Sequence, residues 1–78
     1  MTILVIARSA DPHRQAEALR AALGLTLRGA KVEVVVVGDL LTPLAKRAAD
    51  TLRSFGYAVH DVDPAEAIAR ADRVEVWT

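Results

Sequence analysis

A histidine and two aspartates stand close together near the end of the chain, in the stretch HDVDP at residues 60–64. Side chains of these types can hold a metal ion or move a proton. Successive residues of a strand point to opposite faces of a sheet, so His60 and Asp61 cannot bind one metal ion together without a bulge. Asp63 precedes a proline, which favours a helix cap over a chemical role. We therefore predict no metal site, and keep Asp61 as a candidate ligand-binding residue.

The stretch RSADPH after the first apolar run is the second group of polar side chains. Ser9 lacks the flanking glycines of a nucleophile elbow, and neither glycine-rich phosphate motif occurs in the chain. Asp11 stands before a proline and is expected to cap a helix, with His13 solvated in the first turn. Arg14 lies near the same helix start, where amide groups could hold a small anion weakly. These residues are candidates for a binding rim, and no catalytic residue is predicted.

Three prolines mark the elements that must position these side chains. Each follows a capping residue, and each pair predicts the start of a helix: Asp11-Pro12, Thr42-Pro43 and Asp63-Pro64. Helices are expected at about 12–28, 43–55 and 64–71. Strands are expected in TILVIA, KVEVVVV, YAVHDV and VEVW, which are rich in β-branched or aromatic residues. The order βαβαβαβ predicts a parallel sheet.

We expect one α/β domain over residues 1–78, with three layers and the flavodoxin-like strand order 2-1-3-4. The first helix should then cover one face of the sheet, and the other two helices the opposite face. The carboxyl ends of strands one and three meet where this order reverses. Six side chains could share a crevice there: Ser9, Asp11, His13, Arg14, Asp39 and Asp61. Binding of a small ligand at this crevice, or a reaction through Asp61 and His13, is one expected class of function.

The face under the first helix should be only partly covered, because a helix is about 10 Å wide and four strands span roughly 14 Å. In the last strand Val74 and Val76 are expected to face the core and Trp77 the other side. Trp77 is therefore the candidate interface residue, although a tryptophan that covers the core beside the first helix fits equally well. A chain of 78 residues has a thin core, so a homo-oligomer is expected.

Composition narrows the classes of function. Ten basic and ten acidic side chains cancel, so no long-range positive field would attract nucleic acid or anionic lipid. The apolar runs are too short for a membrane span, and the first residues lack the features of a secretory signal. A cytoplasmic protein without a cofactor is expected. The absence of asparagine and cysteine, with a single glutamine, is compatible with a thermophile or with a high-GC genome.

The stretch ILVIARSADPHRQAEALRAALGLTLRGAKVEVVVVGD joins a short strand, an alanine-rich helix, a basic-Gly turn and a valine-rich strand that ends in Gly-Asp. With the ending AIARADRVEVWT, this pattern resembles the DsrE/DsrF/DsrH-like family of small sulfur-relay proteins over nearly the whole chain. The resemblance implies a flavodoxin-like fold and homo- or hetero-oligomers. It also implies, for some members, persulfide transfer by a cysteine near the end of a middle strand.

HDVDP occupies the position of that reactive segment, but the chain contains no cysteine. Asp61, Val62 or Asp63 stands where the sulfur carrier is expected, and an aspartate cannot form a persulfide. The sulfurtransferase activity is therefore not carried over. The resemblance instead predicts a noncatalytic subunit or regulator of sulfur relay, which binds a cysteine-bearing DsrE-like partner or a second copy of itself.

Overall fold

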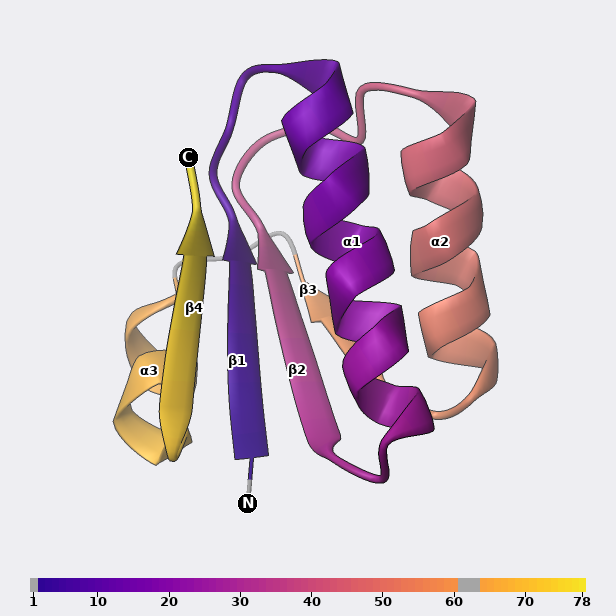
Figure 1. Cartoon of the computed structure of the whole chain (residues 1–78). Coiled ribbons are helices and arrows are strands. Elements are labelled where there is room, and N and C mark those ends of the chain that lie inside the picture. The colour runs from indigo at the N-terminus through magenta and orange to yellow at the C-terminus, as the bar shows by residue number, and fades with distance from the viewer. Residues whose placement is uncertain (1, 61–63) are drawn as a thin grey trace.

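The computed structural model describes residues 2–60 and 64–78. Its elements follow one another as β1 (Thr2–Ala7), α1 (Pro12–Leu27), β2 (Lys31–Val36), α2 (Pro43–Ser54), β3 (Ala58–His60), α3 (Ala65–Arg70) and β4 (Arg73–Trp77). The strands form one parallel sheet with helices on both faces, so the molecule has three layers (Figure 1). The predicted α/β class, the parallel sheet and the order βαβαβαβ are confirmed.

The strand order is 3-2-1-4 rather than the expected 2-1-3-4. Two right-handed crossovers in the same direction place α1 and α2 together on one face, and α3 lies on the other (Figure 1). The prediction that α2 and α3 share a face was therefore wrong. An alternation of strands and helices does not indicate which strand becomes the neighbour of the third strand. That choice depends on contacts between residues far apart in sequence. Within the described residues, β3 pairs with β2 at three positions and forms an edge of the sheet.

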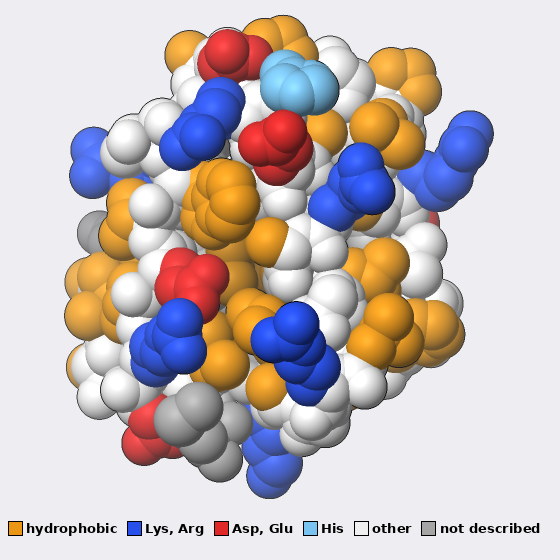
Figure 2. All heavy atoms as spheres, viewed as in Figure 1, with side chains coloured by type: hydrophobic (Ala, Val, Ile, Leu, Met, Phe, Trp, Pro, Cys, Tyr) orange, Lys and Arg blue, Asp and Glu red, His pale blue; other side chains and the backbone are white. Residues whose placement is uncertain are grey.

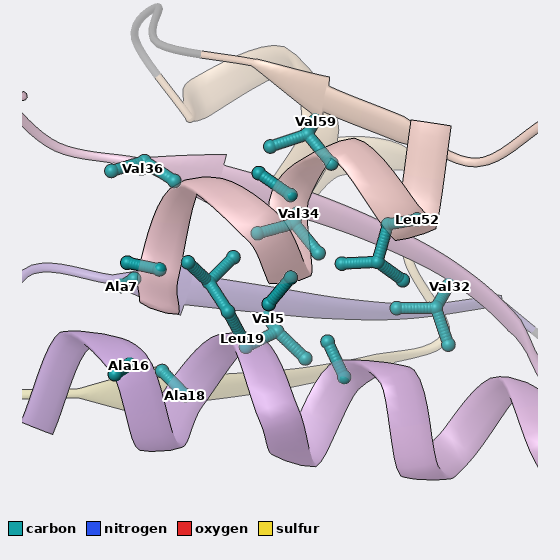
Figure 3. Packing of buried hydrophobic residues seen from close by; sticks show 14 of the residues in the cluster. Val5, Ala7, Ala16, Ala18, Leu19, Val32, Val34, Val36, Leu52 and Val59 are labelled. Atoms are coloured by element: carbon teal, nitrogen blue, oxygen red, sulfur yellow. The ribbon is translucent and has the colours of Figure 1, made fainter. Parts of the chain in front are cut away.

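The larger core lies between the sheet and the two helices α1 and α2. Alternate residues of β1 and β2, such as Val5 and Val34, point to this side and are fully buried. Leu19 of α1 and Leu52 of α2 meet them, and Figure 3 shows these side chains directed into the same space with Val59 of β3. This packing joins both α1 and α2 to one face of the sheet.

The opposite face has a smaller core under α3, made of Leu4, Ile6, Val35 and Ala67. Because α3 has only six residues, it leaves part of this face uncovered. Ile68 of α3 is 44% exposed, and the β4 residues Val74 and Val76 are 37% and 51% exposed. The partly covered face is therefore the α3 face, and the expectation that it lies under the first helix was wrong.

The side chains of β4 also face the opposite sides of the sheet from those predicted. Val74 and Val76 pair in register with Leu4 and Ile6, so they share the α3 face instead of entering the larger core. Trp77 lies on the α1 face and packs, half-buried, against the larger core. A strand in which apolar and charged residues alternate has two distinct sides. The alternation does not indicate which side of the sheet is covered by more helices.

The α1 and α2 face carries a mixture of side chains. Figure 2 shows acidic, basic and hydrophobic groups interspersed on it, and hydrophobic groups gathered along the left margin, the side on which β4 lies in Figure 1. In the part of the chain that the structure describes, no helix is both long enough and apolar enough to cross a membrane.

Two of the three predicted helix caps lie in the described residues. Asp11 Oδ1 accepts a hydrogen bond from the His13 N–H at 2.9 Å, at the start of α1. Thr42 Oγ1 accepts one from the Ala45 N–H at 3.0 Å, at the start of α2. Both caps are as predicted. The third, Asp63, lies outside the described residues, and α3 begins at Ala65.

Replacement of Asp11 by alanine should lower the free energy of unfolding by about 1 kcal/mol, because one amide at the start of α1 loses its partner. Urea denaturation measures this difference. Asp50→Ala is the matched control, since the Asp50 side chain is exposed on α2 and lies 3.9 Å from Arg53. Equal stabilities of the two variants would contradict the capping role.

Candidate functional site

A pocket of about 560 Å³ opens at the carboxyl ends of β2 and β3, beside α2. Its lining comes from the end of β2 and the loop after it, from α2 and from β3: Val36, Gly38, Asp39, Leu40, Lys46, Arg53, Val59 and His60. The volume falls within the roughly 300–1,000 Å³ typical of small-molecule sites. The carboxyl end of a parallel sheet is also where α/β proteins usually bind ligands. This pocket is the candidate functional site.

The pocket has apolar residues at its base and charged residues around them. Val36 and Val59 belong to the larger core and are almost completely buried. Lys46, Arg53 and Asp39 are exposed, which gives two cations and one anion among the described lining residues. None of residues 2–60 and 64–78 forms an ion pair with Lys46. The described lining is therefore positively charged overall.

Arg53 is held in place by the backbone of β3. Its Nη2 donates a hydrogen bond to the Val59 carbonyl at 3.0 Å, and its Nη1 lies 3.9 Å from Asp50 Oδ1. The side chain is 52% exposed, so the remaining guanidinium hydrogens can reach solvent or a ligand. Arg53 is thus a positioned cation whose charge is only weakly paired.

A buried glutamine holds the loop that forms one wall of the pocket. Gln15 of α1 is only 1% exposed. Its Nε2 donates to the Asp39 carbonyl at 2.7 Å, and its Oε1 accepts from the Leu41 N–H at 2.8 Å. Both backbone groups lie in the loop between β2 and α2, so one side chain satisfies a donor and an acceptor that no strand or helix pairs. The amide of Gln15 thereby holds the backbone of Asp39 in position.

His60, another lining residue, is held by a carboxylate on the α3 face. Glu33 Oε2 accepts a hydrogen bond from His60 Nε2 at 2.9 Å. The same carboxylate accepts two hydrogen bonds from Arg70 of α3, from Nη2 at 2.5 Å and from Nε at 3.3 Å. The Glu33 side chain is only 12% exposed, while those of His60 and Arg70 are 38% and 56% exposed. Glu33 therefore joins β2, β3 and α3 at one point.

The environment of Glu33 changes its acidity. Burial raises the pKa of its carboxyl, because desolvation disfavours the charged form. The hydrogen bonds from Arg70 and His60, together with their charges, outweigh burial and bring the pKa below its ordinary value. Glu33 is consequently an anion at neutral pH, and its charge is matched by the Arg70 guanidinium.

Three of the six expected rim residues make local contacts at the start of α1. Ser9 Oγ accepts from the Asp11 N–H at 3.0 Å, and Asp11 caps the helix. His13 Nε2 lies 3.1 Å from Glu17 Oε1, with a His13 side chain that is 83% exposed. These contacts are local to the first turns of α1 and the residues before it, and none of the three side chains lines the pocket beside β3.

Arg14, the fourth rim residue, lies where the strand order reverses, between β1 and β4. Its guanidinium carbon is 5.3 Å from the centre of the Trp77 ring, within the range of a cation–π interaction. Its Nε donates to the Thr78 carbonyl at 3.2 Å. Arg14 and Trp77 therefore contact each other at the expected ligand position, and the pocket lies on the other side of β1.

The remaining rim residues were Asp39 and Asp61. Asp39 lines the pocket, whereas Asp61 lies outside the described residues. The expected crevice between strands one and three does not form, because β2 separates them. Among residues 2–60 and 64–78, no three histidine, aspartate or glutamate side chains converge as a metal site would require.

The sequence reasoning missed the residues that define the pocket and its supports. Lys46 and Arg53 are seven residues apart, which places them on one face of α2 and could have indicated a joint role. Glu33 is the one acidic residue in KVEVVVV, an otherwise apolar strand beyond its first lysine. Gln15 carried no comparable signal, because its two partners lie in a distant loop.

Compared with known protein families, with curated proteins and with solved structures, this chain and its fold give no significant match. What can be concluded about function therefore depends on the pocket and on the chemistry of the residues around it.

Proposed function

We propose that this domain binds a small organic anion, without a chemical reaction, in the pocket at the carboxyl ends of β2 and β3. The observation that carries the proposal is the pairing of Lys46 and Arg53 over an apolar base. Two cations on one helix face can both reach a carboxylate or phosphate group. The buried Val36 and Val59 would contact an apolar body attached to that group.

The hydrogen bonds that hold the walls of the pocket favour ligand binding. Gln15 holds the loop that carries Asp39, and the Val59 carbonyl holds Arg53, so two walls are ordered before a ligand arrives. Preorganised walls reduce the conformational entropy lost on binding. The described lining residues include no serine, threonine or cysteine that a base could activate, so the proposal contains no covalent step.

The other expected function, that of a noncatalytic subunit in sulfur relay, stays a prediction from the sequence pattern. Its specific element, the segment at residues 61–63, lies outside the described residues.

The proposal is tested by titrating the isotope-labelled protein with three probes of increasing apolar content: inorganic phosphate, phenyl phosphate and benzoate. We expect saturable shifts of the Gly38, Asp39 and His60 amide resonances, with tighter binding of phenyl phosphate than of inorganic phosphate. Lys46→Gln should weaken binding of phenyl phosphate by about tenfold, the loss of one charge-assisted contact.

Arg47→Gln is the matched control for this experiment. It removes the same charge one position further along α2, at a residue that does not line the pocket, and should change the affinity less than about twofold. Equal effects of the two variants would attribute binding to net charge. Absence of saturable shifts with all three probes at millimolar concentration would refute the proposed site.

A further inference from the structure

The second edge of the sheet carries a different feature. Strand β4 pairs with β1 on one side, and no described residue pairs with its other side. The Trp77 carbonyl accepts a hydrogen bond from the Arg8 N–H at 2.9 Å, so Trp77 belongs to the set of β4 residues whose backbone faces β1. Because backbone direction alternates along a strand, the N–H and C=O groups of Val74 and Val76 face outward.

The side chains beside this free edge are apolar on one face. Val74 and Val76 are exposed on the α3 face, and Ile68 of α3 is exposed there as well. An open edge with exposed valines is a ready template for another strand. A partner strand would satisfy the outward backbone groups and would extend the apolar surface that α3 leaves uncovered.

On the other face, β4 carries a positive and a negative side chain that can pair with the same two side chains of a second copy. Arg73 and Glu75 stand two residues apart on the α1 face, with Arg73 Nη2 2.8 Å from Glu75 Oε2. When two β4 strands pair antiparallel about a two-fold axis through Val74, Arg73 of each copy stands opposite Glu75 of the other. The same axis sets Val74 opposite Val74 of the second copy, through outward backbone groups.

The alternative axis, through Glu75, also places outward backbone groups opposite each other. It sets the two Glu75 carboxylates directly opposite, which is unfavourable. The charges therefore favour the axis through Val74, and a two-fold axis makes each favourable contact occur twice.

We propose that β4 is the self-association surface of this chain, with two copies paired antiparallel through their β4 edges into one continuous eight-stranded sheet. The occupant is a second copy because the edge is complementary to itself in hydrogen bonding, in its valine side and in its charge pair. The surface is at the opposite edge of the sheet from β3 and the pocket, so self-association and anion binding can be tested separately.

The test is the solution mass, measured by light scattering over a range of micromolar concentrations, together with circular dichroism to establish folding. We expect a particle of about twice the 8.4 kDa chain. Val74→Lys should weaken dimerisation by about tenfold or more, because it sets two like charges directly opposite each other at the two-fold axis. The control is Leu44→Lys on α2, at a leucine that is 51% exposed, against 37% for Val74, and that lies away from β4.

The charge pair gives a second test that also reports strand direction. Arg73→Glu should weaken dimerisation by about tenfold, and the double variant Arg73→Glu/Glu75→Arg should restore it, because the antiparallel axis again sets opposite charges face to face. A folded wild-type protein that stays monomeric throughout would overturn the proposal. So would a dimer that Val74→Lys leaves intact, or one that Leu44→Lys weakens equally.

Discussion

Replacement of Gln15 by leucine should lower the free energy of unfolding by about 2–3 kcal/mol, although the two side chains have similar volumes. The substitution leaves the Asp39 carbonyl and the Leu41 N–H without their partner in a half-buried loop. Each unsatisfied group costs about 1–3 kcal/mol, and partial access of water reduces the sum. Thermal unfolding should shift downward by roughly 10–20 °C in a domain of this size.

Removal of the Gln15 hydrogen bonds should weaken ligand binding at the candidate site as well as stability. Asp39 lines the pocket, and the loop that carries it would no longer be held to α1. Binding of phenyl phosphate should therefore weaken in Gln15→Leu even at a temperature where the variant is folded. Equal affinity and equal stability of variant and wild type would show that the amide of Gln15 does not position the loop.

A second variant separates hydrogen bonding from packing. In Gln15→Glu the ionised carboxylate can still accept from the Leu41 N–H, but it faces the Asp39 carbonyl as a second acceptor. Protonation supplies the missing donor. Burial and the facing carbonyl raise the pKa of this carboxyl in the folded variant. The deficit of this variant relative to wild type, compared at each pH, should therefore shrink as the pH falls from that raised pKa to the unfolded-state value of about 4.3, whereas the deficit of Gln15→Leu should persist.

Replacement of Glu33 by glutamine should lower the free energy of unfolding by about 1–3 kcal/mol at neutral pH. The neutral amide weakens the charge-assisted hydrogen bonds from Arg70 and His60 and leaves the Arg70 cation without its counter-charge. The partial exposure of Arg70 keeps the cost below that of breaking a fully buried pair.

The loss of stability in Glu33→Gln should depend on pH, because Glu33 stabilises the fold only when its carboxyl group is ionised. The pKa of Glu33 is lower in the folded protein than its ordinary value. Its stabilisation is therefore complete above the unfolded-state pKa of about 4.3, and it is lost as the pH falls through the folded-state pKa. The difference between Glu33→Gln and wild type should close over that acidic range, as measured by urea denaturation at a series of pH values.

Glu17→Gln provides the comparison for this pH series. Glu17 contacts His13 on the exposed surface of α1, with a side chain that is 44% exposed, and its loss should cost less than about 0.5 kcal/mol. A Glu33→Gln variant that differs from wild type no more than Glu17→Gln does would contradict the joining role of Glu33 between β2, β3 and α3.

The two proposals place separate functions at the two edges of one small sheet. The pocket is at the β3 edge, where the end of α2 contributes the cation Arg53, and self-association is at the β4 edge. A variant such as Val74→Lys that dissociates the dimer should therefore leave the affinity for phenyl phosphate unchanged. Loss of both properties together would mean that the pocket depends on the second copy.

The sequence by itself determined the elements and the class of fold. Asp11-Pro12 and Thr42-Pro43 predicted the starts of α1 and α2, because a cap and a proline at the first helical position act within one turn. The first two strands were recognised from their continuous apolar character, which is local in the same sense. Alternation of these elements was then sufficient for a parallel α/β sheet.

Only the tertiary structure decided the strand order, the face left uncovered and the place of the pocket. Each of these depends on which strand β3 joins, and the local pattern of a strand does not indicate its neighbour, because strand pairing joins segments far apart in sequence. Gln15 and Glu33 find their partners in segments far along the chain, beyond the reach of local sequence patterns. Glu33 and Arg70 are 37 positions apart, yet their ion pair ties α3 to the sheet, because chain topology rather than sequence spacing brings such side chains together.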